Sequence, residues 1–197
     1  MRSKAVENDP KKNYHWFDAR GKECLNWARK MEKENKIDAA LSWYIRSYFA
    51  FMAGGEAKQG QRVMEEAIRI QDAESFTLSQ CFFQLALAKL KLGVPPEKEI
   101  AKGKEILKRF FGDASISNPF LPLKKRYEGI ASAFEVISLV WEERFEQARG
   151  EFEGNKKKIF TSWGWYGSEI KRLLSSLLRM TSVKEVLQAF VQSNSVG

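Results

Sequence analysis

The side chains that most often carry out catalysis are sparse in this chain. Its 197 residues include one histidine, His15, and two cysteines, Cys24 and Cys81. His15 has no second histidine or cysteine at the spacing of a metal ligand set. Both cysteines lie in apolar stretches, where a free thiol behaves as a small hydrophobe. Neither cysteine protease chemistry nor a bound metal ion is expected from these residues.

One short motif has the spacing of a nucleophile and its lysine. Ser168 to Lys171 reads SerGluIleLys, as in the first motif of the serine β-lactamases. The SerAspAsn and LysThrGly motifs that complete such a site do not occur, so we interpret the segment as a helix cap. The sequence also contains no phosphate loop, no HisGluXXHis motif and no nucleophile elbow. We therefore expect a protein that is not an enzyme and that needs no cofactor; an acid–base site built from Asp and Glu side chains is the alternative that the sequence leaves open.

The organising feature is instead a pair of helical stripes separated by a short polar break. The stripes are formed by residues three or four apart, namely Cys24, Trp27, Ala28 and Met31, and then Ile37, Ala40, Leu41 and Tyr44. Such spacings place each set on one helix face. GluAsnLys, residues 34–36, is too short for a linker, so we expect the two helices to pack antiparallel. Ala28 and Ala40 allow the backbones to approach where the helices cross.

This hairpin resembles a tetratricopeptide repeat. With Ala28 at the family's small eighth position, Ala40 takes the small twentieth position and Tyr44 the aromatic twenty-fourth. Two weaker matches to the repeat place Ala101 and Ala148 at the small twentieth position of further hairpins. Cys24 departs from the tryptophan that the family prefers, and the three alanines are irregularly spaced. The resemblance covers about half of the chain.

We predict an all-α fold in which antiparallel hairpins form a short, irregular α-solenoid, with an irregular helical bundle as the alternative. Residues 1–13 are expected to be a flexible tail and residues 14–197 a single repeat-like domain. The apolar spacing, and the glycines and prolines that interrupt it, predict helices over about 14–34, 37–53, 56–70, 75–92 and 96–111. A further helix is predicted from Pro122, with a break near residues 142–144. Residues 113–122 are predicted to be a long loop and residues 154–158 a turn.

The resemblance implies that the first helices of the hairpins line a groove for a peptide or a partner helix. In the best-matching repeat the groove positions correspond to Lys22, Leu25, Arg29, Glu32 and Lys33. From these we take Lys22, Arg29 and Lys33 as candidate partner-binding residues. The equivalent positions of the other hairpins include Phe83, Leu87, Ile137 and Val140, which suit either an apolar partner or a groove that the protein fills itself.

Residues 160–167 combine aromatic rings with glycine, and Trp163 and Trp165 are further candidate partner-binding residues. Exposed rings there could stack on a ligand. We expect instead that at least one of the two rings is buried against Leu173–Leu177, where it would plug the hydrophobic end of the fold.

The net charge of +8 leaves nucleic-acid binding as the alternative function. The basic side chains that would contact phosphates fall into three clusters, namely Lys98, Lys102, Lys108 and Arg109, then Lys124, Lys125 and Arg126, and then Lys156, Lys157 and Lys158. Acidic residues are interleaved with them, as on an ordinary solvated helix. A contiguous basic face would favour nucleic acid, whereas a mixed face would favour a protein partner.

Composition favours a folded protein. Hydrophobic residues make up 44% of the chain, and 14 phenylalanines and six tryptophans are too many for a disordered chain. No apolar run is long enough for a membrane span, and the N-terminal residues lack the apolar block of a signal peptide. We expect a cytoplasmic protein that acts as an interaction module or scaffold, and the sequence is compatible with a homo-oligomer.

Overall fold

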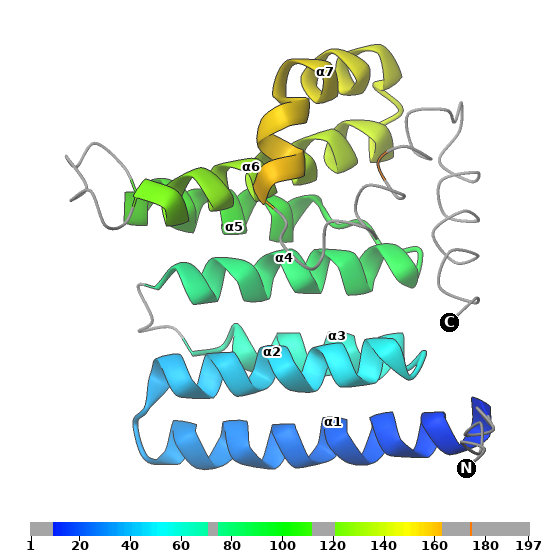
Figure 1. Cartoon of the computed structure of the whole chain (residues 1–197), viewed down its shortest axis with the longest axis vertical. Coiled ribbons are helices and arrows are strands. Elements are labelled where there is room, and N and C mark those ends of the chain that lie inside the picture. Colours follow the sequence, from blue (N-terminus) through cyan, green and yellow to red (C-terminus); the bar gives the residue numbers. More distant parts are fainter. Residues whose placement is uncertain (1–9, 71–74, 112–120, 163–173, 175–197) are drawn as a thin grey trace, which may run out of the picture. The chain divides into compact units, whose positions relative to one another are not determined.

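The computed structural model describes residues 10–70, 75–111, 121–162 and 174. Within these residues the regular structure consists of seven α-helices and no strand, which confirms the all-α prediction (Figure 1). The chain divides into two compact units, Met1–Ala73 and Glu74–Gly197. The expected single domain and its solenoid arrangement stay predictions.

The first unit contains α1 (Pro10–Lys33), α2 (Ile37–Ala53) and α3 (Ala57–Ala67). The bounds of α2 are those predicted, whereas α1 begins at Pro10, within the stretch expected to be a tail. Ala28 and Ala40 are both fully buried where α1 and α2 pack together, as predicted. Small side chains there let the two helix backbones approach closely, and the Ser47 hydroxyl donates a 2.7 Å hydrogen bond to the Gly21 carbonyl.

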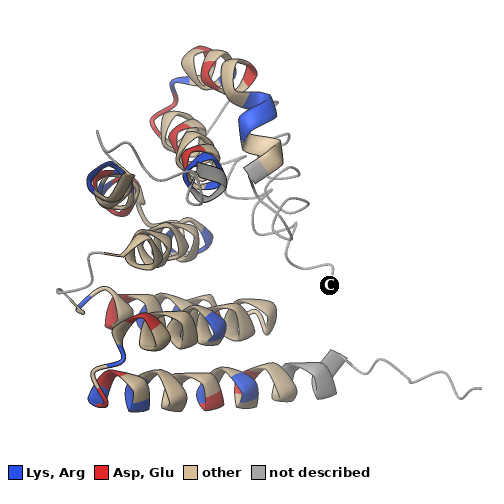
Figure 2. Cartoon of the chain, turned by 60° about the vertical axis from the view of Figure 1, so that its left-hand side comes forward, with Lys and Arg blue, Asp and Glu red and all other residues tan. Residues whose placement is uncertain are grey.

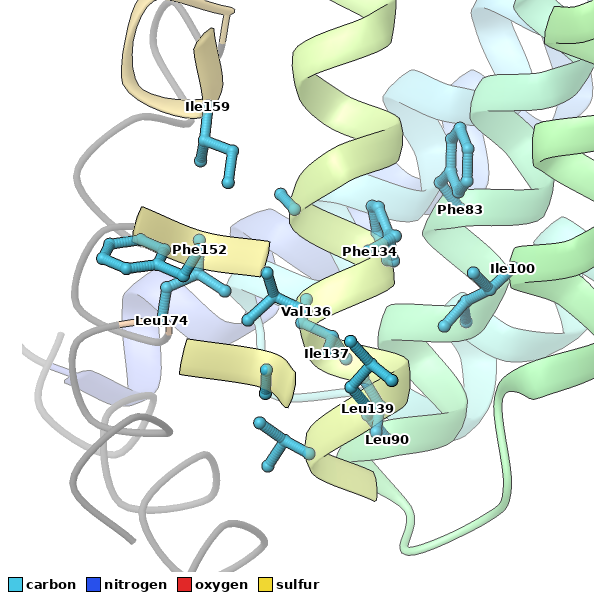
Figure 3. Close-up of a cluster of buried hydrophobic side chains, with 14 of the residues drawn as sticks. Phe83, Leu90, Ile100, Phe134, Val136, Ile137, Leu139, Phe152, Ile159 and Leu174 are labelled. Atoms are coloured by element: carbon cyan, nitrogen blue, oxygen red, sulfur yellow. The ribbon is translucent and has the colours of Figure 1, made fainter. Parts of the chain in front are cut away.

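The second unit contains α4 (Phe76–Lys91), α5 (Glu97–Phe111), α6 (Leu121–Trp141) and α7 (Phe145–Ser162). Their apolar faces form one core, which Figure 3 shows between α4, α6 and α7. Phe83 of α4 and Phe134 of α6 stack with ring centroids 4.6 Å apart. A side chain this large stabilises the fold by about 1.5–3 kcal/mol when fully buried. Ile159 of α7 and Leu174 complete the same core.

Four helix ends share one turn geometry. The left-handed residues are Asn35, Gly55, Gly93 and Glu143, with φ between 57° and 79°. In every case the N–H of this residue bonds to the carbonyl three residues earlier, and the next N–H bonds to the carbonyl five residues earlier than itself. This is the Schellman motif, which satisfies the last carbonyls of a helix. Glycine is the usual residue at this position and asparagine also occurs there, so Glu143 is the one of the four whose residue type does not favour the conformation.

Three of these turns are followed at the same interval by a small buried residue. Ala40, Gly60 and Ala148 each lie five positions after the left-handed residue. The Cβ that Gly60 lacks would lie 2.8 Å from Sδ of Met52, so α3 packs against α2 at this point. The repeated feature of the chain is therefore a turn followed by a close helix contact.

Two further predictions are corrected by the structure. Ala101, expected at a buried helix crossing, is exposed, and Gly103 makes the close contact instead. A Cβ at Gly103 would lie 2.8 Å from the Phe83 ring, so the site accepts only glycine without a shift. Residues 154–158, expected to form a turn, lie inside α7. The predicted break at 142–144 is confirmed, because α6 ends at Trp141 and α7 begins at Phe145.

Most of the predicted loop over residues 113–122 lies outside the described residues, as do Trp163 and Trp165. The plug formed by these tryptophans stays a prediction.

Candidate functional site

The three predicted partner-binding residues of α1 lie on one flank of the helix and are exposed. Lys22 forms a 2.7 Å ion pair with Asp18 one turn earlier, and Lys33 lies in the last turn of α1. Arg29 is bound more firmly, because Nε and Nη2 donate to the two carboxylate oxygens of Glu66 in α3 at 2.6 and 2.8 Å. A bidentate pair of this kind is the strongest common form of ion pair.

Tyr44 links this ion pair to α2 and to a second carboxylate, Glu32 of α1. Its buried hydroxyl lies 2.7 Å from Oε2 of Glu32 and 3.0 Å from Oε1 of Glu66, so that one proton faces two carboxylates. Burial, reinforced by the two carboxylates, raises the pKa of Tyr44. The guanidinium of Arg29 lowers the pKa of Glu66, and the bond from Tyr44 acts in the same direction. The network fastens α1, α2 and α3 to one another, which leaves Arg29 less available to a partner.

The opposite flank of α1 carries a feature that the sequence analysis did not assign. Trp27 and Trp43 stack across the seam between α1 and α2 with ring centroids 6.0 Å apart and planes 23° from parallel. Lys30 Nζ lies 4.8 Å from the Trp27 ring centroid, and the Arg46 guanidinium lies 4.5 Å from that of Trp43. We call these four residues the tryptophan column.

The column is accessible and carries positive charge at both ends. Trp27 is 40% exposed, which is unusual for a tryptophan in a packed hairpin. Lys30 follows Trp27 by one turn and Arg46 follows Trp43 by one turn, so the antiparallel helices bring the two cations from opposite directions. Arg46 forms no ion pair with any described residue. Its guanidinium, held against a ring, keeps N–H donors at its edge.

The column lies on the side of the hairpin that faces away from α3. Trp43 and Arg46 occupy one flank of α2, whereas Tyr48 and Met52, which contact Gly60 of α3, occupy another. Burial raises the pKa of the neighbouring Cys24 thiol, and the positive charges of Arg20 and Arg46 act against this. Arg20 also forms a 2.6 Å ion pair with Glu23. The seam is thus a basic, partly aromatic strip that also includes the carboxylates of Glu23 and Glu34.

A sequence signal for the column existed and was missed. TrpAlaArgLys and TrpTyrIleArg each place a cation three residues after a tryptophan, which on a helix brings the cation over the ring. Trp27 was predicted only to belong to the apolar stripe of its helix. The stacking of Trp27 on Trp43 follows from how α1 and α2 pack and could not be read from either motif alone.

The predicted basic clusters of the second unit are mixed with acidic residues. Glu105 forms ion pairs with Lys102 at 2.9 Å and with Arg109 at 2.7 Å, and Glu153 forms one with Lys156 at 3.3 Å. Figure 2 shows acidic and basic segments side by side along α5, α6 and α7. The clusters therefore do not form a continuous basic face in the described part of the chain.

Two of the clusters nevertheless meet at a groove between α5 and α6. Lys104 and Lys108 line one wall and Lys124 the other, and the groove encloses about 550 Å³. The third cluster reaches it through Lys158, whose Nζ lies 3.8 Å from Glu128 of the groove wall. Lys98, Lys125, Arg126 and Lys157 do not line the groove.

The apolar positions that the resemblance placed in a binding groove lie in the core of the second unit. Phe83, Ile137 and Val140 are each at most 2% exposed, and Leu87 packs against the same cluster. The protein itself fills the space that a partner would need. These positions are therefore closed to a partner.

Other classes of site find little support in the described residues. These contain no group of three or more histidine, cysteine, aspartate or glutamate side chains able to hold a metal ion. Cys24 and Cys81 are free thiols and are buried. Across the helices of the ranges given above, none is both long and apolar enough to cross a membrane. Comparison with known proteins finds no matching family model, no matching curated protein and no matching solved structure.

Proposed function

We propose that this chain is a non-catalytic protein-interaction module and that the tryptophan column is its principal binding surface. The observation that carries the proposal is the exposed stack of Trp27 on Trp43, flanked by Lys30 and Arg46. Tryptophan and arginine are the residues that most often dominate the energy of protein interfaces. Here they are already ordered by their mutual contacts, so binding would cost little side-chain entropy.

The charge of the column favours a partner surface that combines carboxylates with an apolar side chain. Three cations, Arg20, Lys30 and Arg46, lie around the two rings. The acidic residues beside them are Glu23 and Glu34, which pair with Arg20 and Lys36. A carboxylate can accept two parallel hydrogen bonds from the edge of the Arg46 guanidinium. An apolar partner residue would cover the exposed part of Trp27.

A protein partner is favoured over a nucleic acid at this surface. Each ring of the column already stacks on the other and holds a cation, so a base could stack only by displacing one of them. The basic clusters of the second unit are partly neutralised by Glu105, Glu128 and Glu153. Both features match the mixed surface of a protein-binding module.

Affinity capture from native extract tests the proposal. The bait chain is compared with its Trp27→Ala and Arg46→Ala variants, and with Val94→Ser as a control for loss of an exposed apolar side chain elsewhere. We expect a protein retained by the wild type and by Val94→Ser, and lost with either column variant at equal bait loading. Retention by all four baits would contradict the role of the column.

Nucleic-acid binding remains the second candidate, and the gathering of lysines from α5, α6 and α7 around one groove favours it. If it occurs, affinity should fall steeply with salt, because each neutralised phosphate releases a counterion. Replacing Lys156, Lys157 and Lys158 together by Gln should then flatten the slope of log affinity against log salt. Absence of binding to single- and double-stranded DNA and RNA at low salt would exclude this candidate.

A further inference from the structure

The groove between α5 and α6 has the dimensions of a small-molecule site. Its volume of about 550 Å³ lies within the range of about 300–1,000 Å³ that is typical of ligand pockets. Both walls belong to the second unit, so the groove is complete within it. The lining residues of α5 run from Ala101 to Phe111, a rise of about 15 Å, whereas four turns of a partner helix extend over about 20 Å.

The floor of the groove is apolar. Leu107 and Phe111 of α5 reach it from the core, where both are buried, and Ala101 and Ala131 widen it because their side chains are short. The limited apolar surface that the groove leaves accessible is covered most favourably by the hydrocarbon or aromatic part of a ligand.

The acidic residues around this floor are paired with cations, whereas two of its lysines have no acidic partner among the described residues. Glu105 is held by Lys102 and Arg109, and its pKa is lowered chiefly by the hydrogen bond from Lys102. Glu128 lies 3.8 Å from Lys158. Both acidic residues of the groove therefore have cationic partners of their own.

Among the lysines that line the groove, Lys104 is paired with Glu135 of α6. Lys108 of α5 and Lys124 of α6 form no ion pair with any described residue. These two ammonium groups come from opposite walls. Because the acidic residues are already compensated, the pair attracts an anion to a position above the apolar floor.

We infer that the α5–α6 groove binds a small amphiphile whose anionic head lies between Lys108 and Lys124 and whose apolar body covers Leu107 and Phe111. A phosphate or a carboxylate can serve as the head, because the amines of lysine recognise either as a point charge. This site is distinct from the tryptophan column, which lies in the other unit, and the inference does not depend on the proposed function.

Calorimetric titration with decyl phosphate and with decanoate, both below their micellar concentrations, tests the inference. Decyl maltoside and inorganic phosphate are titrated as neutral and head-only probes. We expect saturable 1:1 binding of at least one anionic amphiphile, and affinity at least tenfold weaker for decyl maltoside and for inorganic phosphate. Which of the two anions binds more tightly identifies the preferred head.

Two variants locate the site. Lys108→Gln/Lys124→Gln should weaken binding about tenfold or more. Lys98→Gln/Lys157→Gln removes the same charge from exposed lysines outside the groove and should leave the affinity within about twofold of wild type. Ala101→Trp, at an exposed position on the groove wall, should block binding while circular dichroism and the unfolding midpoint show that the fold is retained.

The inference is overturned by any of four results. These are no binding of either anion, equal binding of decyl maltoside, equal weakening by the two lysine double variants, or binding unaffected by Ala101→Trp. Tighter binding of a short oligonucleotide than of either amphiphile, sensitive to the same lysines, would assign the groove to nucleic acid instead.

Discussion

Trp27 of α1 and Trp43 of α2 stack 6.0 Å apart on the exposed seam of their hairpin, and each ring carries the cation that follows it by three residues. Neither helix could present this surface alone, because each contributes one ring and one cation. The seam therefore depends on the close packing of α1 on α2. Any change that separates the two helices should weaken both the fold and the binding surface.

Ala40→Leu tests this packing. Ala40 is fully buried at the helix contact, so the larger side chain should overpack it and lower the free energy of unfolding by about 1–3 kcal/mol. Urea unfolding followed by circular dichroism measures the change. Ala101→Leu is the control, since Ala101 is exposed and should shift stability by no more than about 0.5 kcal/mol. An unchanged midpoint for Ala40→Leu would contradict the predicted contact.

Gly103 and Gly150 should respond oppositely to alanine, although both lie inside helices. A Cβ at Gly103 would press against the Phe83 ring, and Gly103→Ala should destabilise the protein by about 1–3 kcal/mol. No heavy atom lies within 4 Å of a Cβ built at Gly150, so Gly150→Ala should stabilise it by about 0.5–1 kcal/mol through helix propensity. Thermal unfolding of the two variants distinguishes these signs, and a gain in stability for Gly103→Ala would refute the close packing.

The α6–α7 turn offers a stabilising substitution. Glu143 has φ of 60°, in the left-handed region that costs a residue with a side chain about 1–2 kcal/mol, so Glu143→Gly should raise stability by up to about 1 kcal/mol. Gly55 has φ of 79° in the equivalent turn, and Gly55→Ala should lower the stability of the protein by a similar amount. Differential scanning calorimetry would detect both shifts. A loss of stability in Glu143→Gly would show that the strain is absent.

Glu66 should make the protein sensitive to acid. Its pKa in the folded state is lowered, first by Arg29, so the unfolded chain binds a proton at a higher pH than the folded one. The stabilisation is fully present above the usual glutamate pKa of about 4.3 and is lost as the pH falls through the folded-state value. Glu66→Gln should therefore flatten the fall of the unfolding midpoint between about pH 5 and pH 2. Glu146→Gln, at an exposed carboxylate, should retain the wild-type slope; equal slopes in all three proteins would contradict the role of Glu66.

The helices could be predicted because apolar spacing and glycine breaks determine them locally. The prediction of a turn at residues 154–158 was wrong, because tertiary packing outweighed the local preference of Gly154 and Asn155 for a turn. Phe152 and Ile159, seven residues apart on one face, are both buried, and Asn155 bonds back to the carbonyl and carboxylate of Glu151. Burial of this face on both sides of Gly154 keeps α7 helical through it.

The candidate sites were predictable only in part. The exposed lysines and Arg29 follow from a helical wheel, but their pairing depends on contacts between helices, as in the bidentate bond from Arg29 to Glu66. The left-handed conformation of Glu143 has no sequence signal, because glutamate does not favour it. The tryptophan column required knowing which faces of α1 and α2 meet.

Site-specific photo-cross-linking in native extract is the most direct test of the proposed function. A benzophenone side chain replaces Glu23, which lies on the column side of α1, or Lys98 in the second unit as a control. We predict a discrete protein adduct from position 23 that persists after nuclease treatment, disappears when Trp27→Ala is added, and is absent from position 98. No adduct from position 23, an adduct removed by nuclease, or an adduct indifferent to Trp27→Ala would contradict binding of a protein partner by the tryptophan column.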